Sequence, residues 1–127
     1  LIIKNNLTNK VFIKKHVEDP NKVFKNYQIL ISPSLFEGCS NSVIEALNQN
    51  LIVILSNCPG GNFEILSNGK NGLLFKPDDP YDLSLKIKKV LKKPKYYYQK
   101  SQYYKGNLKR FLLSKNVSSY TKLFDKI

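Results

Sequence analysis

The sequence has only two cysteines and no long apolar run, and each shortage excludes a class of protein. Two cysteines cannot build a disulfide-rich framework, which favours a reducing, cytosolic setting. They also lack the Cys-x-x-Cys spacing that is typical of zinc and redox sites. Because no stretch of about 18 apolar residues occurs, no transmembrane helix is predicted.

The start of the chain lacks a methionine and a signal segment. It opens with Leu1, and no charged stretch followed by an apolar stretch comes after it. The 127 residues suit one domain with little to spare. We therefore expect this sequence to be a piece of a longer protein.

Acidic residues are scarce in the last third of the chain. Residues 84–127 hold thirteen Lys and Arg but only one acidic residue, Asp125, whereas residues 1–83 balance eight basic against eight acidic residues. Such segregation is unusual for a uniformly basic nucleic-acid-binding protein. It favours a neutral, catalytic body over residues 1–83 followed by a basic tail.

Short apolar runs alternate with helical patterns along the body. Strands are predicted at residues 11–13, 28–32, 51–55 and 73–75. Helices are predicted at residues 20–26, 42–50, 63–67, 79–94, 95–113 and 117–126. The second and third runs are typical of strands buried on both faces. The alternation predicts an α/β fold with a doubly wound parallel sheet, Rossmann-like, followed by C-terminal helices.

Ligands of such sheets bind beyond the carboxyl ends of the strands, which points to the loops at 33–41 and 56–62. The first loop runs into a predicted helix, whose free N–H groups and dipole favour a phosphate. Glu37 lies in this loop and Glu45 in the first turn of the helix, while Gly38 lets the backbone approach a ligand. Two carboxylates beside a phosphate-binding helix start suit a sugar nucleotide.

Purely structural explanations stay open for both loops. Ser42 and Glu45 have the spacing of a capping box, and Glu37 fits an ordinary solvated loop residue. In the second loop, Gly60-Gly61 either lets a ligand come close, with Glu64 lining the same crevice, or forms a simple tight turn.

From about Lys10 to about Leu91 the chain carries an ordered set of short motifs. In sequence order they are Asp19-Pro20, Ser32-Pro33-Ser34, Phe36-Glu37-Gly38, Asn41, Glu45-Ala46-Leu47, Cys58-Pro59-Gly60-Gly61, Glu64-Ile65-Leu66 and Asn68-Gly69-x-x-Gly72-Leu73-Leu74. In this register the chain resembles the C-terminal, donor-binding domain of retaining glycosyltransferases of family 4, which have the GT-B fold. The resemblance covers about two thirds of the chain, and Glu37 and Glu45 match the Glu-x7-Glu pair of that family. We place the partial nucleotide-sugar-binding, Rossmann-like domain at residues 1–93, with basic, Tyr-rich helices over residues 94–127 that pack on the same domain.

The resemblance implies transfer of a sugar from a nucleotide-sugar donor, a UDP- or GDP-sugar, to a glycan or lipid-linked acceptor with retention, as in polysaccharide biosynthesis. It implies that Glu37 is the catalytic carboxylate, facing hydroxyls of the donor sugar, and that Glu45 holds the ribose. The other implied donor-binding residues are Gly38, Cys39, Ser40, Asn41, Ser42, Gly60, Gly61 and Glu64. It implies no metal and no cofactor, because the helix dipole and basic side chains stabilise the leaving diphosphate.

The resemblance places the diphosphate-binding Arg and Lys and the acceptor-binding N-terminal domain of the family before residue 1. We therefore expect this chain alone to bind a donor weakly and to transfer nothing. It departs from the family at Lys15, Asn50 and Ile52, where Gly, Gly and Pro are usual. These departures keep open a degenerate, non-catalytic domain that serves as a binding or scaffold module.

The basic tail contains Tyr96-Tyr97-Tyr98 and Tyr103-Tyr104 among ten Lys and Arg between residues 88 and 115. Tyrosine with lysine suits a membrane surface, single-stranded nucleic acid or a plain solvated helix face. We expect a cytoplasmic protein, with contact to the inner membrane face as the alternative to a solvated tail and no nucleic acid as partner. The lone His16, in a lysine-rich turn, is expected to be a surface or structural residue.

Overall fold

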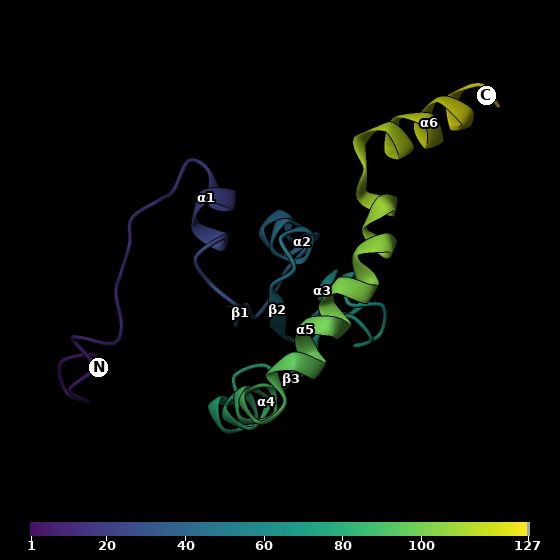
Figure 1. Cartoon of the computed structure of the whole chain (residues 1–127). Helices are drawn as coiled ribbons and strands as arrows, with labels where there is room; N and C mark the ends of the chain where they lie inside the picture. Colours follow the sequence, from purple (N-terminus) through teal and green to yellow (C-terminus); the bar gives the residue numbers. More distant parts are fainter. Residues whose placement is uncertain (127) are drawn as a thin grey trace.

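The computed structural model describes residues 1–126, and the side chains of residues 103–107 lie outside this description. The elements follow the order α1 (Pro20–Phe24), β1 (Ile29–Ser32), α2 (Asn41–Asn48), β2 (Ile52–Ser56), α3 (Asn62–Ile65), β3 (Leu73–Phe75), α4 (Pro80–Lys92), α5 (Pro94–Tyr103), the 3-10 helix η1 (Tyr104–Phe111) and α6 (Leu113–Phe124). Figure 1 shows the helices around a small central sheet, with the two chain ends far apart.

The sheet of the described chain has three parallel strands in the order β1-β2-β3. Ile29 pairs with Ile52 across β1 and β2, and Ile54 pairs with Leu73 across β2 and β3. A parallel order of this kind with helices between the strands is the predicted α/β architecture, so the fold class is confirmed.

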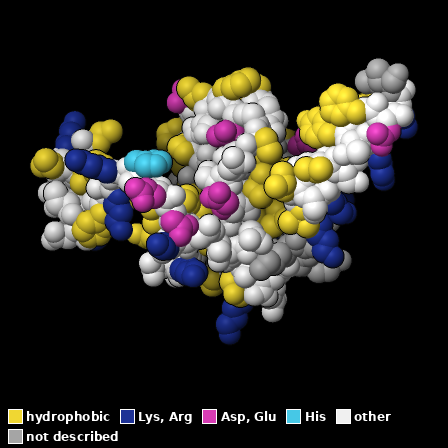
Figure 2. Space-filling model, turned by 90° about the horizontal axis from the view of Figure 1, so that it is seen from above, with side chains coloured by type: hydrophobic (Ala, Val, Ile, Leu, Met, Phe, Trp, Pro, Cys, Tyr) yellow, Lys and Arg dark blue, Asp and Glu magenta, His cyan; other side chains and the backbone are white. Residues whose placement is uncertain are grey.

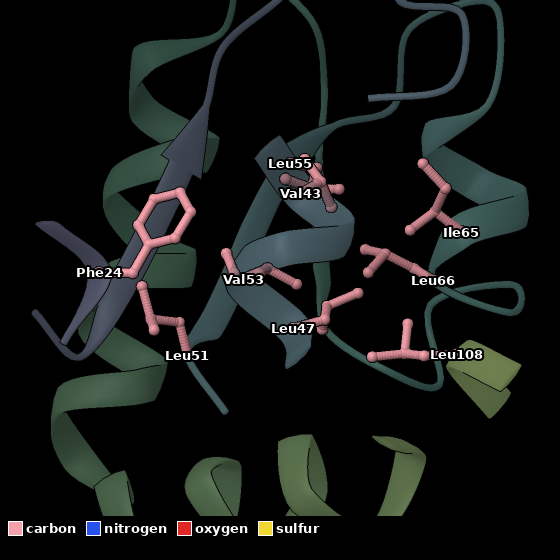
Figure 3. Packing of buried hydrophobic residues seen from close by; sticks show 10 residues of the cluster. Phe24, Val43, Leu47, Leu51, Val53, Leu55, Ile65, Leu66 and Leu108 are labelled. Atoms are coloured by element: carbon pink, nitrogen blue, oxygen red, sulfur yellow. The ribbon is translucent and has the colours of Figure 1, made fainter. Parts of the chain in front are cut away.

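The central strand β2 is buried on both faces, as its apolar run predicted. On one face Val53 and Leu55 pack against α2, α3 and η1 (Figure 3). On the other face Ile52 and Ile54 pack against β3 and α4. Side chains alternate across a strand, so this one strand joins two hydrophobic cores.

The edge strand β1 is only half-buried, which contradicts the expectation that both of its faces are covered. Ile31 is 38% exposed, because the described chain places no strand beside β1. The predicted strand at residues 11–13 does not form either: these residues have no regular structure, and Phe12 is 74% exposed. A short apolar run favours a strand only when a partner strand is within reach. The segment before α1 instead runs away from the sheet (Figure 1).

Local sequence signals set the ends of two helices as predicted. Asp19 caps α1 by accepting a hydrogen bond from the N–H of Asn21, with Pro20 in the first turn. Asp79 caps α4 by accepting from the N–H of Asp82 (2.9 Å). Such caps satisfy N–H groups that have no partner inside the helix.

The basic tail forms three segments rather than the two predicted helices. The expected helix over 95–113 is divided into α5 and the 3-10 helix η1, in which Gly106 disfavours α-helix, and α6 begins at Leu113 instead of residue 117. Ser101 on α5 donates its hydroxyl to the carbonyl of Asn50 (3.1 Å), and Leu108 on η1 enters the core. The grouping of Tyr103-Tyr104 with the other tail aromatics concerns side chains outside the described part.

Helix α6 contacts η1 and projects from the body (Figure 1). Its apolar residues recur at helical spacing and are at least half exposed: Leu113, Val117, Tyr120, Leu123 and Phe124. Yellow side chains follow this arm in Figure 2. At about 100° per residue, Lys115 and Lys122 lie on the side of α6 opposite most of this stripe. No described helix is both long enough and apolar enough to cross a bilayer.

Candidate functional site at the carboxyl ends of the strands

Two loops leave the carboxyl ends of β1 and β2, residues 33–40 and 57–61, and they are hydrogen-bonded to each other. The N–H of Glu37 donates to the carbonyl of Pro59 (N···O 3.3 Å). The N–H of Gly61 donates to the carbonyl of Glu37 (3.0 Å) and to the carbonyl of Gly38 (2.7 Å). The two loops therefore continue the parallel pairing of β1 and β2 past the ends of the strands.

The two glycines of the second loop are required by this contact. A Cβ on Gly60 would lie 1.6 Å from the carbonyl oxygen of Glu37, and a Cβ on Gly61 would lie 2.1 Å from that of Gly38. Gly60 also has φ +116°, which side chains rarely adopt. The sequence suggested close approach to a ligand or a simple turn, whereas the structure shows close approach of one loop to the other.

Gly38 has a different environment from Gly60 and Gly61. A Cβ added to Gly38 would meet no atom within 4 Å, so the space above it is open. The backbone of Gly38 is exposed at the surface of the loop that leads into α2. No described side chain therefore covers this backbone, and the role of Gly38 in ligand binding stays a prediction.

The Glu37 carboxylate is half-buried and has one hydrogen-bond partner among the described residues. Ser34 donates its hydroxyl to Glu37 Oε2 (3.2 Å), and Ser32 lies within hydrogen-bond distance of Ser34 (Oγ···Oγ 3.2 Å). Ser56, which is fully buried, donates its hydroxyl to the carbonyl of Ser34. Glu37 is therefore held by side chains as well as by the backbone pairing of the loop.

The structure corrects the expected start of α2. Its N-cap is Ser40, and the helix begins at Asn41, so Glu45 lies in the second turn rather than the first. The capping box of Ser42 and Glu45 does not form, because a capping box needs Ser at the N-cap and Glu three residues later. Ser42 instead lies 3.1 Å from Ser40, hydroxyl to hydroxyl. The half-buried Glu45 carboxylate accepts no hydrogen bond from the described residues.

The N-terminus of α2 has the features that favour an anion. It belongs to an eight-residue helix, its N-cap side chain makes no hydrogen bond to the helix backbone, and Asn41 and Ser42 are exposed there. The first N–H groups of such a helix have no partner within the helix. Neither loop of the site contains Lys or Arg, so these N–H groups and the helix dipole are the positive features that the site itself supplies.

Glu64 lies on α3, exposed, and no hydrogen bond or ion pair of the described chain joins it to the Glu37 loop. Its carbonyl, with that of Ile65, accepts hydrogen bonds from the guanidinium of Arg110. Arg110 also lies over the ring of Phe111, 4.7 Å from its centroid. This tail residue, which the sequence analysis counted only as surface charge, thus ties η1 to the end of α3.

One residue that shapes the second loop was not predicted from the sequence. Asn62 is fully buried at the start of α3 and donates its amide to the carbonyl of Ser56 (3.0 Å) and to the sulfur of Cys58 (3.5 Å). The sequence offers only an asparagine directly after a glycine pair; that it is buried, and so held by hydrogen bonds, is seen only in the structure.

A cavity of about 400 Å³ opens next to this edge of the sheet, on the side of α4. Its lining is mainly apolar, with Leu35, Phe75 and Leu83, but it also includes Asp78 and Asp79. Carboxylates disfavour an anion, so within this edge the start of α2 suits a phosphate better than the cavity does.

The remaining chemistry-bearing side chains form no second centre within the described part. Cys39 is exposed, Cys58 is buried, and both are free thiols. His16 is exposed. No three His, Cys, Asp or Glu side chains of residues 1–126 are grouped so that they could hold a metal ion. The pKa of Asp82 lies below its usual value because the backbone N–H of Lys76 and the ammonium of Lys86 bond to it, away from the site.

The three-stranded parallel sheet with helices on both faces has the fold of the C-terminal domain of GT-B glycosyltransferases. The chain belongs to the group 1 glycosyl transferases, whose family model matches residues 1–126. This membership and the fold confirm the family that the sequence motifs indicated.

Three similar proteins illustrate the membership. An uncharacterized glycosyltransferase of Methanocaldococcus jannaschii is 39% identical over 90 residues, which cover 61% of this chain and 22% of that protein. The UDP-N-acetylglucosamine–peptide N-acetylglucosaminyltransferase GtfA subunit of Streptococcus agalactiae is 32% identical over 87 residues, 66% of this chain and 17% of that protein. The crystal structure of the C-terminal domain of the group 1 glycosyl transferase LpcC from Francisella tularensis has a TM-score of 0.68 at 20% identity, over 80% of this chain and 53% of that chain. This chain spans about a fifth of the length of the two curated relatives.

Proposed function

We propose that this chain is the donor-binding part of a retaining glycosyltransferase, which binds a nucleotide sugar at the carboxyl edge of the sheet. The observation that carries the proposal is the fixed position of the Glu37 loop, bonded to the Gly60-Gly61 loop and leading directly into the N-terminus of α2. A carboxylate held beside a helix N-terminus supplies the two features that a sugar diphosphate needs, an acceptor for hydroxyls and a cradle for phosphate.

In this proposal each site residue has a distinct role. Glu37 contacts hydroxyls of the donor sugar, and Glu45 accepts the ribose hydroxyls, for which its carboxylate has free acceptor capacity. The backbone of Gly38 to Ser42, with Cys39, Ser40 and Asn41 between them, faces the sugar and the diphosphate. Gly60 and Gly61 pack against the carbonyls of Glu37 and Gly38 and so hold that backbone in place. Glu64 borders the pocket. The basic side chains that neutralise the diphosphate, and the acceptor domain, belong to other parts of the protein.

We propose a UDP-sugar as the donor in preference to a GDP-sugar. The support is the relative named for UDP-N-acetylglucosamine, to which two thirds of this chain align at 32% identity. The acceptor is a glycan or lipid-linked glycan of polysaccharide biosynthesis, and the protein works in the cytoplasm. The chain by itself binds donor but does not transfer sugar.

The departures from the family pattern affect this proposal less than the sequence alone suggested. Asn50 has φ 63°, so it keeps the left-handed conformation that the usual glycine would adopt, and asparagine tolerates it better than other side chains do. Ile52 lies buried in β2, where a β-branched residue is favourable. Lys15 is exposed in the irregular N-terminal segment. Asn50 and Ile52 therefore do not support the alternative hypothesis of a degenerate scaffold domain. Among these three departures, only Lys15 still supports it.

Ligand-observed NMR with UDP-, GDP- and ADP-sugars tests the donor site directly, because it detects weak binding. We expect a signal for a UDP-sugar that Glu45→Ala abolishes while the variant stays folded. Glu18→Ala, which removes an exposed carboxylate from the irregular segment before α1, is the matched control and should leave the signal unchanged. Equal signals from both variants, or none with any donor, would contradict the proposed function.

Contact of the tail with the inner membrane face is the second part of the proposal. It is supported by the thirteen basic residues after residue 83 and by the exposed apolar stripe of α6, since such helices bind anionic lipid surfaces. The test is sedimentation with vesicles of phosphatidylcholine alone and with added phosphatidylglycerol. Binding to the anionic vesicles that Val117→Ser and Phe124→Ser reduce is expected, and equal recovery from both vesicle types would contradict it.

A further inference from the structure

Two serine hydroxyls form a chain that ends on the Glu37 carboxylate. Ser34 donates to Glu37 Oε2, and Ser32 and Ser34 are joined hydroxyl to hydroxyl, both at 3.2 Å. A serine hydroxyl has one proton, and that of Ser34 is used on the carboxylate, so Ser32 must be the donor to Ser34. Both protons therefore point toward Glu37, and hydrogen bonds in such a chain strengthen one another.

Ser34 is also fixed through its backbone. The carbonyl of Ser34 accepts the hydroxyl of Ser56, a fully buried residue at the end of β2. The carbonyl of Ser56 in turn accepts the buried amide of Asn62. Ser56 of β2 thus holds the carbonyl of Ser34, and Ser32 at the end of β1 bonds its hydroxyl oxygen. The hydroxyl proton of Ser34 is then directed to Glu37.

The result at Glu37 is a carboxylate with one oxygen engaged and one free. Oε2 accepts from Ser34, whereas Oε1 accepts no hydrogen bond from the described residues. The side chain is half-buried, so solvent and ligands reach it. A carboxylate fixed in this way presents Oε1 in one orientation and avoids the loss of rotamer freedom on binding.

We propose that Ser34, oriented by Ser32 and Ser56, is a positioning residue that holds the Glu37 carboxylate with Oε1 free for a hydroxyl of the donor sugar. This inference rests on the proposed function, because it assigns Ser34 to the sugar rather than to the nucleotide. Loss of the Ser34 hydroxyl then weakens binding of the sugar moiety and leaves binding of the nucleotide intact.

The experiment is an NMR titration of the 127-residue chain with UDP and, separately, with UDP-N-acetylglucosamine. The dissociation constant for UDP divided by that for UDP-N-acetylglucosamine measures what the sugar adds to affinity. Ser34→Ala should lower this ratio about tenfold, since a hydrogen bond to a charged group is worth roughly that factor. Ser32→Ala should lower it less, and Ser34→Thr, which keeps the hydroxyl, should restore it.

Two further measurements separate positioning from folding. Ser119→Ala removes a serine hydroxyl that bonds a helix carbonyl in α6, and this matched control should leave both affinities unchanged. Three-bond couplings that report the Glu37 χ1 angle need no ligand. They should show one rotamer in the unsubstituted chain and in Ser34→Thr, and averaged rotamers in Ser34→Ala.

The outcomes distinguish this inference from the proposed function. If Ser34→Ala weakens UDP and UDP-N-acetylglucosamine equally, or leaves both the ratio and the χ1 couplings unchanged, Ser34 is not a positioning residue. If the unsubstituted chain binds neither ligand, the proposed function fails while the χ1 couplings still decide the inference. A lowered ratio together with averaged χ1 angles supports both.

Discussion

The carbonyl oxygen of Glu37 occupies the space that a side chain on Gly60 would need, 1.6 Å from where its Cβ would lie. Any residue other than glycine at position 60 would therefore push the backbone of Glu37 away. This relation connects the two loops of the proposed donor site, and it leads to the first of four predictions.

Gly60→Ala should separate the two loops and destabilise the fold. The added methyl group collides with backbone, and φ +116° strains any side chain, so we expect the free energy of unfolding to fall by about 2 kcal/mol or more. Urea unfolding followed by circular dichroism measures the change. Gly38→Ala is the matched control, since its methyl group enters open space, and it should keep nearly the stability of the unsubstituted chain. Equal losses in the two variants would refute the role of Gly60.

Arg110→Ala should loosen the tail from the body. The guanidinium bonds the carbonyls of Glu64 and Ile65, and its loss should lower the free energy of unfolding by about 1 kcal/mol. Arg110→Lys should not restore it, because an ammonium lacks the planar fork of donors. Lys109→Ala, which removes an exposed charge next to it, serves as control in the same urea titration. An effect of Lys109→Ala as large as that of Arg110→Ala would show that charge alone matters.

Asp82 should make stability depend on acid pH. The N–H of Lys76 and the ammonium of Lys86 hold the pKa of Asp82 below its usual value in the folded chain. Its contribution is therefore fully present above the unfolded value of about 4 and is lost as pH falls through the lower folded value. Asp82→Asn should remove this part of the acid dependence, measured as the urea midpoint from pH 6 to pH 2. An unchanged pH profile of the variant would exclude the effect.

Asn50→Ala should cost about 1 kcal/mol of stability, because alanine disfavours the left-handed conformation at φ 63°. Asn50→Gly should stay close to the unsubstituted chain, since glycine adopts this conformation freely. Thermal unfolding of the two variants side by side gives the comparison. If both substitutions had the same effect, backbone conformation would not be the reason for asparagine at this position.

Most of the sheet could be predicted because its signals are local. The uncharged run of β2 and the Asp79-Pro80 cap of α4 each contain enough information within a few residues. The run at residues 11–13 has the same local character, but a strand also needs a neighbour, and the sequence alone does not supply one. The edge exposure of β1 follows from the same missing neighbour.

The location of the candidate site could be predicted from the sequence, whereas its N-cap and its hydrogen bonds could not. Parallel strands bring their following loops to one edge, so Glu37 and the Gly60-Gly61 pair could be assigned to one region. The N-cap of α2 was misplaced by two residues, because Ser40 and Ser42 are both good N-caps and the sequence alone does not decide between them. The hydroxyl chain from Ser32 through Ser34 to Glu37 depends on the path of the loop after β1, and the anchor from Ser56 depends on the packing of β2 beside it. No spacing in the sequence encodes either.

The backbone bonds between the two loops also have a mechanical meaning. If residues 33–40 moved independently of residues 57–61, the hydrogen bonds from Glu37 to Pro59 and from Gly61 to Glu37 and Gly38 would break. We therefore expect the two loops of the proposed donor site to move together as one rigid unit.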